Sequence, residues 1–241
     1  MPLLTERTIE VGQKLQGFEV KAITDLKQQR MVAYQLEHIK TGARLLHLYS
    51  EDAENLFSIS FPTPPPNSTG VSHILEHSVL AGSKKYPVRE PFFEMLKMSP
   101  ATFINAMTGP DCTYYPVSSK VKQDLFNLAE VYFDAVFHPL LTENTFKREG
   151  HHLAPTDKEN PIGELKFTGV VYNEMNGAFS DPEQRLDSIA NQSLFPDNIY
   201  GLESGGNPQN IPELTYKDFR DFHASYYHPS NAYFVFYGNI S

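Results

Sequence analysis

The segment His73-Ile-Leu-Glu-His77 combines two imidazoles and a carboxylate at a spacing that suits a metal ion. On a helix, positions i and i+4 share one face, and position i+3 lies beside them. His73 and His77 can therefore present two ring nitrogens to one metal, with Glu76 near a metal-bound water. This arrangement could activate water for hydrolysis, with Glu76 as the general base. The competing interpretation is a surface helix that carries two unrelated histidines.

A third metal ligand must come from elsewhere, because a hydrolytic zinc site has three protein ligands and one open position for water. The best candidate is Glu174, in the segment Gly169-Val-Val-Tyr-Asn-Glu-Met175, on a predicted second helix. A helix packed across the first one could bring this carboxylate to the metal. Helical spacing cannot reach across a fold, so Glu164 and Glu183 stay open as alternatives on this argument.

The elements that must hold these residues follow from hydrophobic periodicity. Alternating apolar and polar residues predict strands over 17–23, 31–39, 43–49, 55–61, 102–108, 113–117 and 231–237. Helical spacing predicts helices over 71–81, 91–98, 119–137, 143–151, 164–179, 182–195 and 215–227. We therefore predict one α+β domain over residues 1–241, with an antiparallel-rich sheet of about five or six strands packed against several helices.

Composition restricts the partners and the compartment. The formal net charge is −9, and no Lys/Arg cluster could neutralise phosphates, which argues against nucleic acid as a partner. No apolar run approaches the length of a membrane span, so no membrane partner is expected. Cys112 is the single cysteine, which fits a reducing compartment. The first twenty residues show no targeting pattern, so we expect a cytoplasmic protein, or an organellar one if a presequence has been removed.

Five stretches of the chain carry a family resemblance: Gly70–Gly82, Tyr86–Phe92, Phe103–Thr108 with Asp111 and Tyr115-Pro116, Gly169–Met175 with Gly177-Ala-Phe, and His228–Ala232 with Tyr237-Gly-Asn. Together they resemble the pitrilysin/insulinase-type metallopeptidases, and most closely their presequence protease and falcilysin-like branch. His-x-x-Glu-His is the pattern typical of inverzincin peptidases. The similarity spans nearly the whole chain.

The resemblance implies a zinc endopeptidase that cuts short unstructured peptides, with Glu174 as the third zinc ligand. It also implies that Asn105 and Ala106 lie on an edge strand that binds peptide backbone. Enzymes of this branch have four similar domains arranged as a clam shell, and the chain resembles the first of them. The other domains of the same polypeptide are thus expected partners, and the far half supplies an Arg and a Tyr at the substrate carbonyl.

Two features qualify this expectation. The related short-chain branch has a second Glu seven positions before the third ligand, where this chain has Phe167, so the carboxylate that supports the zinc histidines is not identified by the sequence. The alternative function is a zinc-binding scaffold that is non-catalytic as an isolated fragment. An intact Glu76 favours a catalytic parent protein, because a scaffold needs no base at that position.

Overall fold

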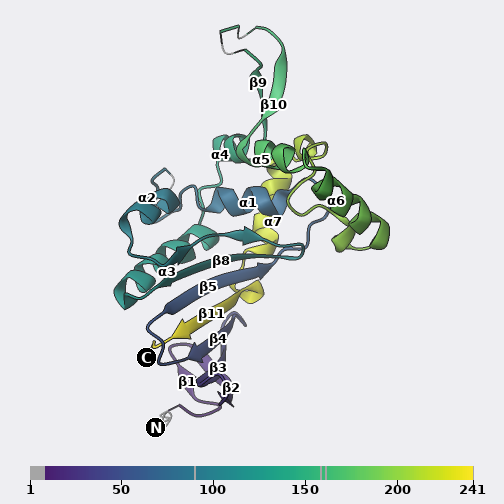
Figure 1. Ribbon diagram of the computed structural model, residues 1–241. Helices are drawn as coiled ribbons and strands as arrows, with labels where there is room; N and C mark the ends of the chain where they lie inside the picture. Colours follow the sequence, from purple (N-terminus) through teal and green to yellow (C-terminus); the bar gives the residue numbers. More distant parts are fainter. Residues whose placement is uncertain (1–8, 90, 158, 161, 241) are drawn as a thin grey trace.

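The computed structural model describes residues 9–89, 91–157, 159–160 and 162–240. Within these ranges one nine-stranded sheet has the order β1-β2-β3-β4-β11-β5-β8-β6, and β7 also pairs with β8 (Figure 1). Its strands are β1 (Lys14–Leu15), β2 (Phe18–Leu26), β3 (Met31–His38), β4 (Arg44–Tyr49), β5 (Asn55–Pro62), β6 (Phe103–Ile104), β7 (Met107–Thr108), β8 (Cys112–Ser119) and β11 (Tyr233–Gly238). Only the β4–β11 pairing is parallel.

The predicted α+β class is confirmed. The long strands of the sheet are β2, β3, β4, β5, β8 and β11, each of six to nine residues, which matches the expected strand number. The additional strands β1, β6 and β7 have two residues each. β1 is too short for an alternating pattern to reveal. β6 and β7 lie within the predicted strand over 102–108, which is not continuous, because Asn105 and Ala106 are not in a strand. The β3–β4 hairpin turns at Gly42, whose φ of 72° suits glycine.

The helices carry the apolar stripes that the periodicity predicts. They are α1 (Val71–Val79), α2 (Pro91–Met98), α3 (Lys122–Phe137), α4 (Glu143–Glu149), α5 (Val170–Ala178), α6 (Pro182–Leu194) and α7 (Tyr216–Tyr226). Side-chain caps fix where several of them begin, because a hydroxyl or carboxylate oxygen accepts a free backbone N–H. Thr142 caps α4, Asp181 caps α6 and Thr215 caps α7. None of the described helices is long and apolar enough to cross a membrane.

The core lies between the sheet and the helices. β5 alternates strictly, with Phe57, Ile59 and Phe61 buried, and α3 packs on β5 and β8. The largest fully buried side chains of the described residues are Tyr115, Tyr132, Phe61, Phe219, Ile59 and Ile74. At about 25 cal/mol per Å² of apolar surface, each such side chain contributes roughly 1.5–3 kcal/mol to folding. Ile74 belongs to α1, so this helix is packed directly into the core.

Helix α1 is almost completely enclosed. It contacts α4, α7, β7 and β8, and of its nine residues His73 and His77 are the two that are not buried. Buried polar groups are satisfied within the helix where possible, as Ser78 Oγ donates to the Ile74 carbonyl at 2.6 Å. The open side of α1 is therefore the side that carries both histidines.

One predicted helix is wrong in its first part. Residues 164–168 are not helical: β10 (Leu165–Thr168) pairs antiparallel with β9 (His152–Pro155) and forms a separate two-stranded hairpin. In Figure 1 this hairpin extends away from the body of the domain, beyond α4 and α5. A side chain at Gly169 would meet the Gly150 carbonyl oxygen at 2.1 Å, so the two ends of the hairpin meet closely where α5 begins. The predicted helix over 143–151 likewise ends at Glu149.

Candidate metal centre

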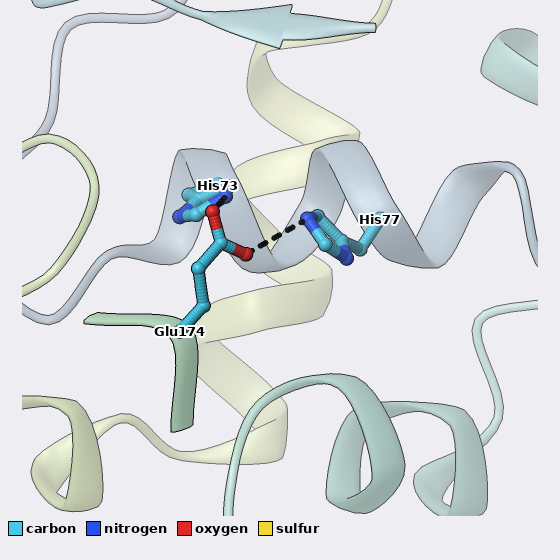
Figure 2. A group of neighbouring side chains, drawn as sticks. All are labelled: His73, His77 and Glu174. Carbon is cyan, nitrogen blue, oxygen red and sulfur yellow. Dashed lines mark ion pairs between the residues drawn. The ribbon is translucent and has the colours of Figure 1, made fainter. Parts of the chain in front are cut away.

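Three side chains from two helices converge on the open side of α1. Figure 2 shows His73 and His77 one turn apart on α1, with Glu174 reaching up from α5 between them. His73 Nε2 lies 3.8 Å from Glu174 Oε1, and His77 Nε2 lies 3.8 Å from Glu174 Oε2. The three ligand atoms all lie within 4.8 Å of one another. Sequence spacing left the third residue open, and the fold brings Glu174 to the pair.

The two other carboxylates considered from the sequence do not join this group. Glu164 directly precedes β10 in the projecting hairpin, and Glu183 lies in the first turn of α6. Among the described residues, His73, His77 and Glu174 form the one group of three or more potential ligands at such separations. The geometry therefore separates Glu174 from the alternatives, which local spacing could not do.

The ring of His73 is held by the backbone. Its Nδ1 lies 2.9 Å from the carbonyl oxygen of Gly205. A carbonyl oxygen can only accept, so Nδ1 is the donor, and in the neutral ring the lone pair then lies on Nε2. This is the ligand-ready tautomer, and Nε2 is the atom that faces Glu174.

The ring of His77 is held by a carboxylate that the sequence did not identify. Its Nδ1 lies 3.6 Å from Glu149 Oε2 at the end of α4, and Glu149 Oε1 accepts from Arg148 Nε at 2.7 Å. Burial opposes ionisation of Glu149, but its contacts with His77 and Arg148 outweigh burial and lower its pKa. Burial also opposes protonation of His77, yet Glu149, Glu76 and Glu174 outweigh it and raise the pKa of His77.

Glu149 is the carboxylate beside a zinc histidine that the sequence did not identify. Phe167 lies on β10, away from the histidines, and its ring is 6.1 Å from the rings of both His151 and Tyr172. A metal-binding histidine commonly has a carboxylate or carbonyl group beside its second ring nitrogen. His73 has the Gly205 carbonyl at hydrogen-bond distance, and His77 has Glu149 at ion-pair distance. No local spacing links Glu149 to His77, so the fold alone reveals the pair.

Glu76 lies on the inner side of the same helix. It is 8% exposed, and its Oε2 accepts a hydrogen bond of 2.8 Å from Thr108 Oγ1 on β7. Its negative charge raises the pKa of Tyr132, whose burial is the larger cause. The carboxylate is therefore fixed in orientation by a strand at the sheet edge, rather than solvated on the surface.

The predicted peptide-binding residues lie beside this carboxylate. Asn105 and Ala106 connect β6 to β7, at the sheet edge opposite β1. The buried Tyr132 donates its hydroxyl to the Asn105 carbonyl at 3.1 Å, which anchors the connection to α3. A pocket of about 300 Å³ opens here, lined by Glu76, His77, Leu80, Ala81, Phe92, Asn105, Ala106, Arg148, Glu149 and Val170.

The donor set and its spacing fit a zinc ion. Two imidazole nitrogens and a carboxylate are zinc's ordinary ligands, and with bonds of about 2.0–2.2 Å tetrahedral ligand atoms stand about 3.4 Å apart. The observed 3.8 Å separations are close to that value. The Glu174 side chain is 54% exposed, so it has room to adjust and leaves a coordination position open toward solvent.

Comparison with known proteins identifies the family of the chain. Residues 63–159 match the profile of the insulinase family, peptidase family M16, and residues 213–241 match the profile of the M16 inactive domain. The chain belongs to peptidase family M16. His73, Glu76, His77 and Glu149 lie within the first matched segment, whereas Glu174 lies beyond it.

Individual relatives match nearly the whole length of the chain. It is 49% identical over 237 residues to the mitochondrial presequence protease of Mus musculus, covering 98% of this chain and 23% of that protein. It is 46% identical over 240 residues to presequence protease 1, chloroplastic/mitochondrial, of Arabidopsis thaliana, covering 99% and 22%. Protein HypA of Clostridium perfringens is 50% identical over 225 residues, covering 92% and 23%.

Solved structures show the same fold. Pitrilysin superposes with a TM-score of 0.71 at 22% identity, over 93% of this chain and 23% of its own. A protease from Helicobacter pylori superposes with a TM-score of 0.68 at 20% identity, over 84% of this chain and 45% of its own. The chain thus spans less than a quarter of the length of the curated relatives named here.

Proposed function

We propose that this M16 domain is the zinc-binding half-site of a metalloendopeptidase that hydrolyses short unstructured peptides. The observation that carries the proposal is the convergence of His73, His77 and Glu174, with the buried Glu76 on the same helix as the two histidines. A structural metal site does not need an oriented carboxylate that stands beside the three ligands without binding the ion. A hydrolytic site needs one as a general base.

In this proposal His73 Nε2, His77 Nε2 and one Glu174 oxygen hold the ion. When bound, zinc acts as a Lewis acid that lowers the pKa of a coordinated water toward about 7. Glu76 Oε2 already accepts a hydrogen bond from Thr108 Oγ1, so we assign Oε1 as the atom that accepts the water's proton. As Glu76 takes this proton, the water oxygen would bond to the carbonyl carbon of the peptide. Glu76 would then deliver the proton to the leaving amine nitrogen as the C–N bond breaks, which gives a carboxylate and a free amine.

Asn105 and Ala106 are assigned to substrate binding. An extended peptide that adds to a sheet edge gains main-chain hydrogen bonds without its sequence being read, which suits broad specificity. The β6–β7 edge lies next to Glu76 and His77, so a peptide bound there places its backbone at the metal. The adjoining pocket has apolar walls at Leu80 and Phe92, which favour an apolar substrate side chain.

We further propose that residues 1–241 form the N-terminal domain of a four-domain polypeptide. The support is the length of the relatives, of which the matched part is less than a quarter. The remaining domains would supply the Arg and Tyr that complete stabilisation of the oxyanion. For location, relatives carry the names of mitochondrial and chloroplastic/mitochondrial presequence proteases, which favours an organelle for the complete polypeptide. Imaging of the complete polypeptide in cells tests this location, and a cytoplasmic distribution would contradict it.

The deciding experiment measures zinc content and peptide hydrolysis together. Elemental analysis of the 241-residue chain should give one zinc per chain, and the complete polypeptide should cleave a quenched-fluorescence peptide. A chain that retains no zinc contradicts the proposal. Zinc without cleavage by the complete polypeptide would instead support the non-catalytic scaffold.

A further inference from the structure

Two glycines from distant parts of the chain touch beside His73. Gly70 precedes α1 with φ 71°, and Gly206 has φ 101° in the loop before α7. A Cβ on Gly70 would lie 2.8 Å from Gly206 Cα, and one on Gly206 would lie 3.0 Å from Gly70 Cα. A Cβ on Gly70 cannot fit unless the Gly206 backbone moves. A Cβ on Gly206 would press on Gly70 and also on the Ile211 side chain at 2.9 Å, so the two backbones approach this closely because both residues are glycine.

The loop that contains Gly206 is anchored to the start of α1 by further hydrogen bonds. Ser72 Oγ donates to the Ser204 carbonyl at 3.2 Å, and Ser72 is fully buried. The Asn207 N–H donates to the Ser68 carbonyl at 2.8 Å, and the Glu203 N–H donates to Ser68 Oγ at 3.1 Å. The loop is therefore fixed against the turn that leads into the metal-binding helix.

Within the loop, Gly205 has a determined orientation. Burial raises the pKa of Glu203, and its interactions with the Gly205 backbone and with Ser188 on α6 partly offset that rise. The Gly205 carbonyl is the acceptor for His73 Nδ1, and a Cβ on Gly70 would lie 2.8 Å from that same oxygen. The glycine contact and the histidine hydrogen bond thus depend on one position of the loop.

Resting on the proposed zinc site, we infer that the Gly70–Gly206 contact positions His73 for metal binding by bringing the Gly205 carbonyl against Nδ1. The contact fixes both the ring orientation and the tautomer, and so selects Nε2 as the ligand atom. His77 is held by a carboxylate and His73 by a peptide carbonyl, so the two ligands are supported by chemically different groups. Gly70 and Gly206 are positioning residues, which act through Gly205 without touching substrate.

The test is Gly206→Ala, compared with Gly42→Ala as a matched control. Both glycines have positive φ, but a Cβ on Gly42 would meet no atom within 4 Å. Gly42 also lies in the β3–β4 turn, remote from the metal site. Alanine at Gly206 must displace the loop, whereas alanine at Gly42 costs only local strain. We expect Gly206→Ala to weaken zinc binding roughly 10- to 100-fold and Gly42→Ala to leave it unchanged.

A second readout does not depend on the metal. In two-bond ¹H–¹⁵N spectra of the metal-free chain, His73 should be the Nδ1–H tautomer, and Gly206→Ala should abolish that preference. If Gly206→Ala does not fold, Ser72→Ala, which removes the Ser204 anchor without adding volume, should shift the tautomer and weaken zinc at least about fivefold. Wild-type tautomer and affinity in the folded variant would overturn the inference. Loss of zinc by the wild-type chain, with the tautomer intact, would overturn the proposed function instead.

Discussion

Glu149 and His77 face each other at the junction of α4 and α1, with Glu149 Oε2 3.6 Å from His77 Nδ1. The pair fixes which ring nitrogen of His77 turns toward Glu174. We predict that Glu149→Gln weakens zinc binding roughly 10- to 100-fold, because the supporting carboxylate keeps His77 oriented and basic. The measurement is a competition titration with a zinc-sensitive chelating dye. Glu143→Gln on the same helix, where Glu143 pairs with Lys147 at 2.8 Å on the surface, is the control and should bind zinc normally.

Glu76→Gln should separate metal binding from turnover. The amide keeps the size of the side chain and an acceptor for Thr108, but it cannot take a proton from water. In the complete polypeptide we expect kcat to fall by about 100- to 10,000-fold, the usual contribution of a general base, with one zinc retained. Retained activity in this variant, measured with the quenched-fluorescence peptide, would end the mechanism.

Glu174→Gln should affect the metal directly. An uncharged amide oxygen is a poorer zinc ligand than a carboxylate. Zinc affinity should therefore fall by more than the roughly 10- to 100-fold expected when a group that supports a ligand is lost. Glu164→Gln, in the projecting hairpin, should retain zinc. Equal zinc content of the two variants by elemental analysis would reject Glu174 as the ligand.

The isolated 241-residue chain should be a weak peptidase or an inactive one. Loss of a single oxyanion donor commonly costs about 100- to 1,000-fold in kcat, and the proposed far half supplies such donors. We therefore expect kcat/KM of the complete polypeptide to exceed that of the chain at least about 100-fold. Comparison at equal zinc occupancy checks this, and robust turnover by the purified chain alone would contradict it.

The sequence was sufficient wherever the signal is local. His73, Glu76 and His77 are neighbours on one helix, and the strands and helices that hold them have the periodicity of half-buried elements. The predicted helix over 164–179 is wrong at residues 164–168. Leu165 and Phe167 there alternate with polar residues, as in a strand. Pairing with β9 decides their conformation, and that is a tertiary contact.

The supporting residues of the site could not be predicted. Glu149, Thr108 and the Gly205 carbonyl meet the α1 side chains only because α4, β7 and the loop before α7 pack around that helix. Their positions in the sequence bear no fixed relation to the His-x-x-Glu-His segment. Glu174 was identified through family resemblance, whereas spacing alone left other carboxylates equally plausible.

β11 lies in the middle of the sheet, parallel to β4 and antiparallel to β5. The ladders β1–β4 and β5–β8 are joined through it alone in the described sheet order. A ribosome therefore releases both ladders before the strand that unites them exists, and a nascent chain presents two open hydrogen-bonding edges. Pairing of β11 with β4 and with β5 then covers these two inner edges and unites the ladders into one sheet, whose outer edges are β1 and β6.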